Sequence, residues 1–159
     1  MFSPLAKLTK KDKVSELEKQ VCQTLFEIEV NNKDLKPMLQ PLQIAAAEEI
    51  AVGKTSKCIV IFYPLKFQKG FKAVQVRLVR EMEKKFQGNS VVLIPQRKAR
   101  TKLPGVKRPY RHTLKAVQEK LCEDISYPLE IVGKRTTIKP NQAEQMRVFV
   151  ILRFLQIFT

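Results

Sequence analysis

Hydrophobic residues recur at three- and four-residue steps in three stretches of the chain, which is the spacing of one face of an α-helix. These stretches are Val14–Asn31, Phe71–Phe86 and Thr113–Ile125. The second is followed by Gly88, a residue type favoured just past the end of a helix. The pattern therefore predicts three amphipathic helices, each with one face buried against another element.

Shorter apolar runs between these segments predict β-strands. Cys58–Tyr63 is continuously apolar and ends at Pro64, as in a strand that is buried on both faces. Val91–Ile94 is a similar run that stops at Pro95, and a further strand is expected near Glu130–Ile138.

The stretch Leu42–Val52, which follows chain breaks at Pro37 and Pro41, fits two patterns. Most of its even positions are apolar, which predicts a half-buried strand. Its alanine-rich part, Ile44–Ile50, is also compatible with a helix, and periodicity alone does not decide between them. We expect a turn at Gly53–Lys57.

The predicted order is helix, strand, strand, helix, strand, helix, strand. This order indicates an α/β (α+β) protein in which one mixed β-sheet is packed by about three α-helices. A chain of 159 residues with 44% apolar content suits one globular domain, so we expect residues 1–159 to form a single domain.

Charge adds the first functional clue, because 30 Lys and Arg stand against 15 Asp and Glu, a net charge of +15. The segment Lys84–Gln118 contains ten of these cations and no carboxylate. An ordinary solvated surface mixes both signs, so this segment indicates an anionic partner. Two kinds of partner are common for chains this basic, namely nucleic acid and an anionic membrane surface.

The most basic part of this segment is an extended loop, Gln96–His112, in which seven of 17 residues are Lys or Arg. The loop has few apolar residues to bury and its charges repel one another, so we expect it to become ordered against a counter-charge. RNA phosphate is the densest common counter-charge, and Tyr110 or His112 can stack on an unpaired base. The alternative is a solvated charge run without a specific partner.

The three cysteines are widely spaced among apolar residues, and we expect Cys22, Cys58 and Cys122 to be free, buried thiols in a reducing compartment. No Cys-x-x-Cys occurs, so we expect no metal and no cofactor. The sequence has no apolar stretch of 18 residues and no signal-peptide core. We therefore expect a soluble cytosolic or nuclear protein with no membrane partner and no small-molecule substrate.

The sequence shows no arrangement of acidic and basic residues that is typical of a catalytic site. His112 has no acid within six residues, so it is expected to face solvent or RNA rather than act as a base. Gly53-Lys54-Thr55 hints at a phosphate loop, but Glu48 stands where that motif requires glycine. An RNA-acting enzyme would need an acid–base constellation, so we expect a protein that is not an enzyme.

Four blocks of sequence resemble one known family. Gln75–Phe86 is similar to the second helix of the S7e family, the eukaryotic small-subunit (40S) ribosomal proteins numbered seven in the eukaryotic series. Val91–Arg97 resembles the strand that leads into the family's basic loop. Lys107-Arg108-Pro109 with Thr113–Val117 resembles the family's loop exit and third helix. Tyr127–Arg135 resembles the strand that follows.

This resemblance implies a non-catalytic structural protein of the 40S subunit. Its expected partners are 18S rRNA and neighbouring small-subunit ribosomal proteins, and its expected locations are the cytoplasmic ribosome and, during assembly, the nucleolus. Together with the charge pattern it predicts an RNA-binding set that comprises Lys84, Lys85, Arg97, Lys98, Arg100, Lys102, Lys107, Arg108, Tyr110, Arg111, His112, Lys134 and Arg135.

The chain also departs from the family pattern. The resemblance runs from about Leu5 to Arg135 and we expect it to end near Ile138, with residues 139–159 as a divergent apolar tail. In Val148–Phe158, nine of eleven residues are apolar, which predicts a buried strand or helix unless the tail is truncated or misread. A membrane anchor is not expected, since a span needs about 20 residues and Arg153 interrupts this one. The alternative function is a free-standing adaptor whose tail docks on a protein.

Overall fold

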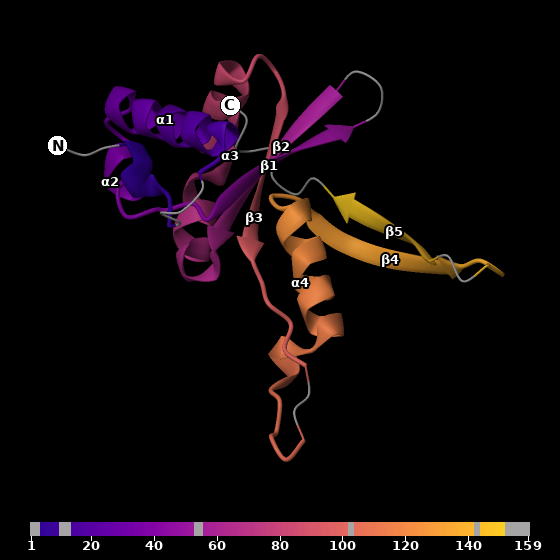
Figure 1. Ribbon diagram of the computed structural model, residues 1–159. Coiled ribbons are helices and arrows are strands. Elements are labelled where there is room, and N and C mark those ends of the chain that lie inside the picture. The colour runs from indigo at the N-terminus through magenta and orange to yellow at the C-terminus, as the bar shows by residue number, and fades with distance from the viewer. Residues whose placement is uncertain (1–3, 10–13, 53–55, 102–103, 142–143, 152–159) are drawn as a thin grey trace. The chain divides into compact units, whose positions relative to one another are not determined.

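The computed structural model describes residues 4–9, 14–52, 56–101, 104–141 and 144–151. They form two compact units, residues 1–98 and residues 99–159. The regular elements are α1 (Glu16–Asn31), α2 (Lys36–Leu39), β1 (Ala46–Val52), β2 (Ser56–Pro64), α3 (Gln68–Lys85) and β3 (Ser90–Gln96) in the first unit, and α4 (Leu114–Ser126), β4 (Glu130–Ile138) and β5 (Glu144–Ile151) in the second (Figure 1). The three predicted long helices and the mixed α/β class are confirmed.

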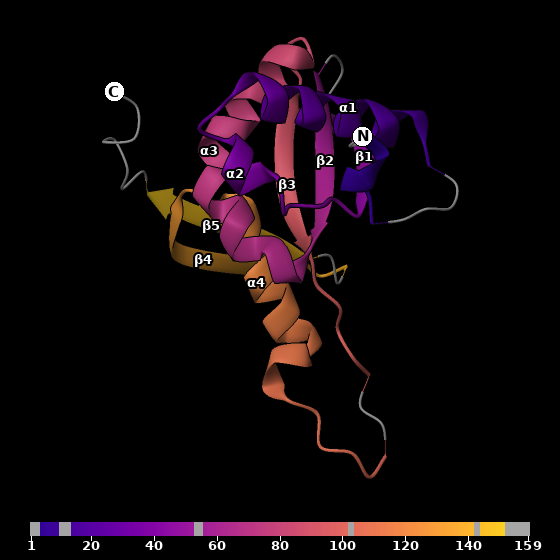
Figure 2. The same ribbon diagram turned by 90° about the vertical axis from the view of Figure 1, so that its left-hand side faces the viewer.

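The first unit is a three-stranded mixed sheet with helices on one face. β2 lies in the centre, antiparallel to β1 and parallel to β3. The parallel pair is joined through α3, which makes a β-α-β unit. The helices α1, α2 and α3 all cover the same face of the sheet (Figure 2).

The hydrophobic core lies between that sheet face and the helices. It contains the apolar stripes of α1 and α3 and the alternating residues of the strands that point toward them. The ring of Tyr63 from β2 stacks on Phe71 from α3, with ring centroids 4.2 Å apart. The largest fully buried side chains include Ile28, Ile61, Tyr63, Phe71, Leu78, Met82 and Leu93.

Local signals explain where the first helices start. Ser15 accepts a hydrogen bond from the backbone N–H of Glu18 and donates its own N–H to that carboxylate, so α1 begins with a capping box. Pro37 does not break the chain as predicted but stands in the first turn of the short helix α2, where its missing N–H costs nothing.

The open question at Leu42–Val52 is decided in favour of a strand. β1 begins only at Ala46, while Ile44 forms an isolated parallel bridge to Leu8. The predicted half-burial fails at the far end, because Ile50 and Val52 are 48% and 55% exposed. There the β1–β2 pair extends away from the helices (Figure 1). The glycine of the predicted turn at Gly53–Lys57 lies outside the described residues.

The second unit consists of α4 and an antiparallel hairpin of β4 and β5. The five strands therefore form two sheets, not the single sheet that was expected. The tail segment forms strand up to Ile151, but it is not buried as predicted, since Phe149 and Ile151 are 56% and 50% exposed. Two residues of the apolar stripe of α4, Leu114 and Ile125, are also exposed.

Candidate nucleic-acid interface

The cationic loop joins β3 to α4. Its backbone contains a turn at Pro104 and Gly105, and Gly105 has a φ of +79°, a conformation that favours glycine. The loop then closes into a single 3₁₀ turn, Tyr110–His112, directly before Thr113 caps α4. In Figure 1 the loop extends beyond the first turn of α4, and the hairpin follows the last turn.

Two hydrogen bonds tie the two sides of this loop together, and we call this contact the neck. The backbone N–H of Arg100 donates to the carbonyl of His112 over 3.0 Å. The guanidinium of Arg108 donates to the carbonyl of Arg100 over 2.6 Å. The neck therefore holds the loop closed while most of its charged side chains face solvent.

Exposure separates the predicted loop residues into two kinds. Tyr110 is 68% exposed and available for stacking, whereas His112, Arg97 and Arg108 are half-buried. His112 is therefore less exposed than predicted, and its backbone carbonyl forms part of the neck. The exposed cations in the described part of the loop are Lys98, Arg100, Lys107 and Arg111. Lys102 lies outside the described residues.

The start of α4 adds to the positive potential. Its first turn contains no acidic residue, and Lys115 stands in it. Thr113 accepts a hydrogen bond from the N–H of Ala116, so one free donor of the helix end is satisfied. The partial positive charge of the helix N-terminus thus adds to the cations of the loop instead of being neutralised.

Lys84 and Lys85 are not brought together with the loop cations of their own unit. They stand in the last turn of α3, whereas Arg97 and Lys98 follow β3. The seven residues of β3 separate these positions by roughly 20 Å. Both lysines also form ion pairs, Lys84 with Glu81 and Lys85 with Glu27, each over 2.9 Å.

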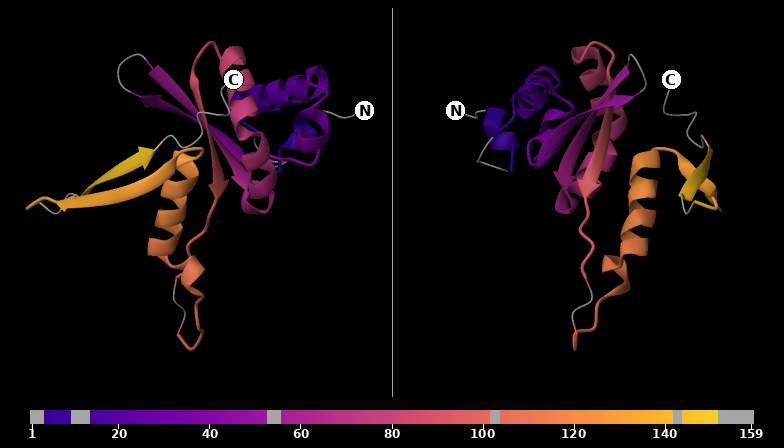
Figure 3. Two further views of the ribbon diagram at one scale, coloured as in Figure 1. Left: turned by 180° about the vertical axis from the view of Figure 1, so that it is seen from behind. Right: turned by 45° about the vertical axis from the view of Figure 1, so that its right-hand side comes forward.

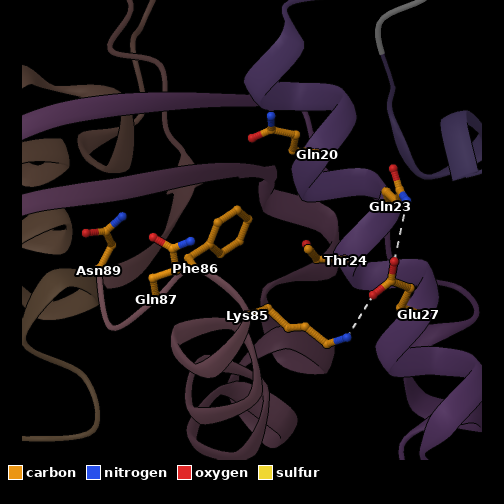
Figure 4. A pocket seen from close by; sticks show the side chains of 8 residues that line it. All are labelled: Gln20, Gln23, Thr24, Glu27, Lys85, Phe86, Gln87 and Asn89. Carbon is orange, nitrogen blue, oxygen red and sulfur yellow. Dashed lines mark hydrogen bonds and ion pairs between the residues drawn. The ribbon is translucent and has the colours of Figure 1, made fainter.

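A polar pocket of about 390 Å³ lies beside Lys85, between α1 and the chain that follows α3 (Figure 4). The hydrogen bond and charge of Lys85 hold the pKa of Glu27 below its usual range. Glu27 also accepts a hydrogen bond from Gln23. The pocket is lined mainly by amides, and its residues are Gln20, Gln23, Thr24, Glu27, Lys85, Phe86, Gln87 and Asn89.

Lys134 and Arg135 lie on β4 and therefore point to opposite faces of the hairpin. Lys134 pairs with Val148, whereas Arg135 pairs directly with Arg147 of β5. Arg147 was not among the predicted residues, because it lies 12 positions further along the chain in the segment expected to be a divergent tail. Only the strand register reveals that the two arginines are neighbours.

Within the described ranges, no three His, Cys, Asp or Glu side chains form a group that could hold a metal ion. Across the same ranges, no helix is both long enough and apolar enough to cross a membrane. The cysteines are free, with Cys22 buried and Cys58 and Cys122 only half-buried. The Gly53-Lys54-Thr55 motif lies outside the described residues.

Fold and charge together define a small, basic, mixed α/β protein with an exposed, carboxylate-free cationic loop. Comparison with known proteins shows which family within this class the chain matches. The model of the family described as Ribosomal protein S7e matches residues 5–152. The chain belongs to the S7e family. The matched residues extend past Ile138, where we expected the resemblance to end.

Individual relatives agree with the family model. Small ribosomal subunit protein eS7z of Arabidopsis thaliana is 39% identical over 155 residues, which cover 94% of this chain and 81% of the relative. Small ribosomal subunit protein eS7 of Schizosaccharomyces pombe is 40% identical over 157 residues, covering 94% and 80%. For eS7A of Saccharomyces cerevisiae the identity is 41% over 140 residues, covering 85% and 73%.

Proposed function

We infer that the chain is a structural, non-catalytic constituent of the small (40S) ribosomal subunit. Membership of the S7e family supports this placement, because the relatives are named as small-subunit ribosomal proteins. The proposal includes binding to 18S rRNA, contacts with neighbouring ribosomal proteins, and a role in assembly. It places the protein on cytoplasmic ribosomes and, during assembly, in the nucleolus.

One observation above all supports RNA as the direct partner. Lys84–Gln118 carries ten cations and no carboxylate, and four of those cations are exposed on the loop. Phosphate contacts of this kind position a protein on RNA without reading its sequence. The predicted RNA-binding residues are thus proposed to supply affinity, and Tyr110 a stacking surface for an unpaired base.

Sedimentation of the tagged chain from a cell lysate tests the placement in the subunit. We expect the protein to co-migrate with 40S particles, and to remain with them in high-salt gradients because many contacts would have to break together. A light, RNA-free peak would contradict the proposal and favour the free-standing adaptor.

A loop variant tests the RNA contact itself. Replacing Lys98, Arg100, Lys107 and Arg111 with Ala keeps the half-buried Arg97 and the neck bond of Arg108. Each phosphate contact contributes about 0.7–0.9 to the salt slope, so the slope of log K against log salt for deproteinised 18S rRNA should fall by about three. The thermal transition should be nearly unchanged, since these side chains are exposed.

The matched control removes four exposed lysines from the first unit, namely Lys19, Lys33, Lys36 and Lys69. It lowers the net charge by the same amount, so a purely long-range effect of charge would weaken binding equally. An equal loss in both variants would show that the loop is not the RNA-binding element.

A further inference from the structure

The β4–β5 hairpin of the second unit carries a pair of facing arginines that lies outside the loop. Its register places Arg135 of β4 directly opposite Arg147 of β5. A β-bulge at Val132, between Ile131 and Gly133, shifts the faces of β4, and from Gly133 onward alternate residues keep to one face. Both arginines are exposed, and neither forms an ion pair within the part of the chain that the structure describes.

Like charges in this position repel each other. Directly opposite residues of an antiparallel pair have Cβ atoms roughly 4.5–5.5 Å apart, and equal charges there destabilise the pair. An anion placed between two guanidinium groups reverses this, because each group can donate two hydrogen bonds to phosphate or carboxylate oxygens. The pair is therefore a site that gains from a bound anion.

The next pair on the same face adds an aromatic side chain beside the arginines. Phe149 pairs with Gly133, and one atom of its ring, Cδ2, would be 3.7 Å from a Cβ built on that glycine. Gly133 has no side chain that could cover the ring, and 56% of Phe149 is exposed. Two residues along a strand span about 7 Å, so an aromatic surface lies beside the arginine pair.

The pair on the other side of the arginines is polar. Thr137 pairs with Gln145, and both are exposed. The face therefore presents an aromatic ring, two guanidinium groups and two hydrogen-bonding side chains in sequence along the hairpin. The opposite face mixes apolar residues, such as Val148 and Met146, with the polar residues Lys134 and Thr136.

We propose that this face binds an unpaired RNA nucleotide, with its phosphodiester between Arg135 and Arg147 and the adjacent base stacked on Phe149. That the ligand is RNA rests on the proposed function, and the aromatic surface favours it over an acidic peptide. Aromatic side chains stack on unpaired bases of any sequence, whereas bases inside a duplex are not accessible to them. The site uses none of the loop residues, and α4 lies between the loop and the hairpin along the chain.

The test uses the full-length chain and a 12-nucleotide unpaired RNA, compared with the same RNA annealed to its complement. Arg135→Thr and Arg147→Thr should each weaken binding to the unpaired RNA about fivefold or more. Because both groups bind one phosphate, the double variant should lose at most about twofold more than either single variant. Its salt slope should fall by about 0.7, the value for one contact to a single strand.

Three further variants distinguish a guanidinium clamp from a simple effect of charge and from a folding defect. Arg147→Lys keeps the charge and the fold but lacks the planar fork, so it should also lose affinity. Phe149→Leu should weaken binding to the unpaired RNA at least fivefold and leave the duplex unaffected, whereas Phe149→Tyr should retain affinity. Removing the repulsion should leave the thermal midpoint of the arginine variants unchanged or higher.

The control is Arg77→Ala, which removes one exposed guanidinium from α3 in the first unit. Losses no larger than this control, additive losses in the double variant, or equal competition by polyglutamate would overturn the inference. If the loop variant loses RNA binding while the hairpin variants do not, the inference fails and the proposed function stands. If the unmodified chain binds neither RNA, both fail.

Discussion

Single side chains show how burial alters chemistry in this fold. The Cys22 side chain is fully buried in α1. Burial, with a smaller contribution from the charge of Glu18, raises the pKa of the Cys22 thiol to about 11. The sequence predicted a buried thiol from its apolar neighbours, but the contact with Glu18 follows from one turn of helix and from the capping box that fixes that carboxylate.

This shift makes stability depend on alkaline pH. Unfolded Cys22 loses its proton near pH 9, its ordinary value, whereas the folded thiol keeps it until about pH 11. The contribution of Cys22 is therefore fully present below pH 9, and the free energy of unfolding falls by roughly 2–3 kcal/mol as the pH rises through this window.

Urea unfolding followed by circular dichroism between pH 8 and 11 measures this effect. Cys22→Ala removes the thiol, so its free energy of unfolding should fall less steeply over the same range. Other titrating groups are common to both proteins and cancel in the difference. Parallel pH profiles would contradict the assignment to Cys22.

At the scale of elements, periodicity predicted the helices well and their burial less well. The stripes of α3 and α4 look alike in sequence, yet Leu78 is fully buried and Leu114 is 61% exposed. The difference depends on what lies against each helix, which a local pattern does not contain. For the same reason the predicted RNA-binding set includes Arg135 but not Arg147, since only pairing across the hairpin relates the two residues.

One substitution made in both helices measures this difference. Leu78→Ala leaves a cavity between α3 and the sheet and should cost about 2–5 kcal/mol of unfolding free energy. Leu114→Ala removes an exposed side chain and should stay within about 0.5 kcal/mol of the parent protein. Chemical denaturation of both variants provides the comparison. Equal losses of unfolding free energy would show that the apolar stripe of α4 is buried as fully as that of α3.

At the scale of the whole molecule, the two units differ in how much apolar surface they bury. The hydrophobic core belongs to the first unit, whereas Ala116 and Val117 are the buried apolar residues in the described part of the second. In the described residues, β4 and β5 form a two-stranded sheet (Figure 3). A two-stranded hairpin is marginally stable in water, so the second unit gains most from a bound partner.

Hydrogen exchange followed by mass spectrometry tests this difference on the isolated chain. Amides of α4, β4 and β5 should exchange at least tenfold faster than those of α1, α3 and β2, because local opening is cheapest where few apolar contacts break. Adding RNA should slow exchange in the second unit more than in the first. Uniform protection across both units would contradict this account.

The neck has a consequence for how the loop can change its length. Because the backbones of Arg100 and His112 are already joined, residues inserted between them only enlarge a ring that is closed at its base. Doubling such a ring costs about 0.6 kcal/mol of chain entropy, and the start of α4 stays in place. This part of the chain is therefore open to insertions and deletions that adjust its reach without disturbing the helix behind it.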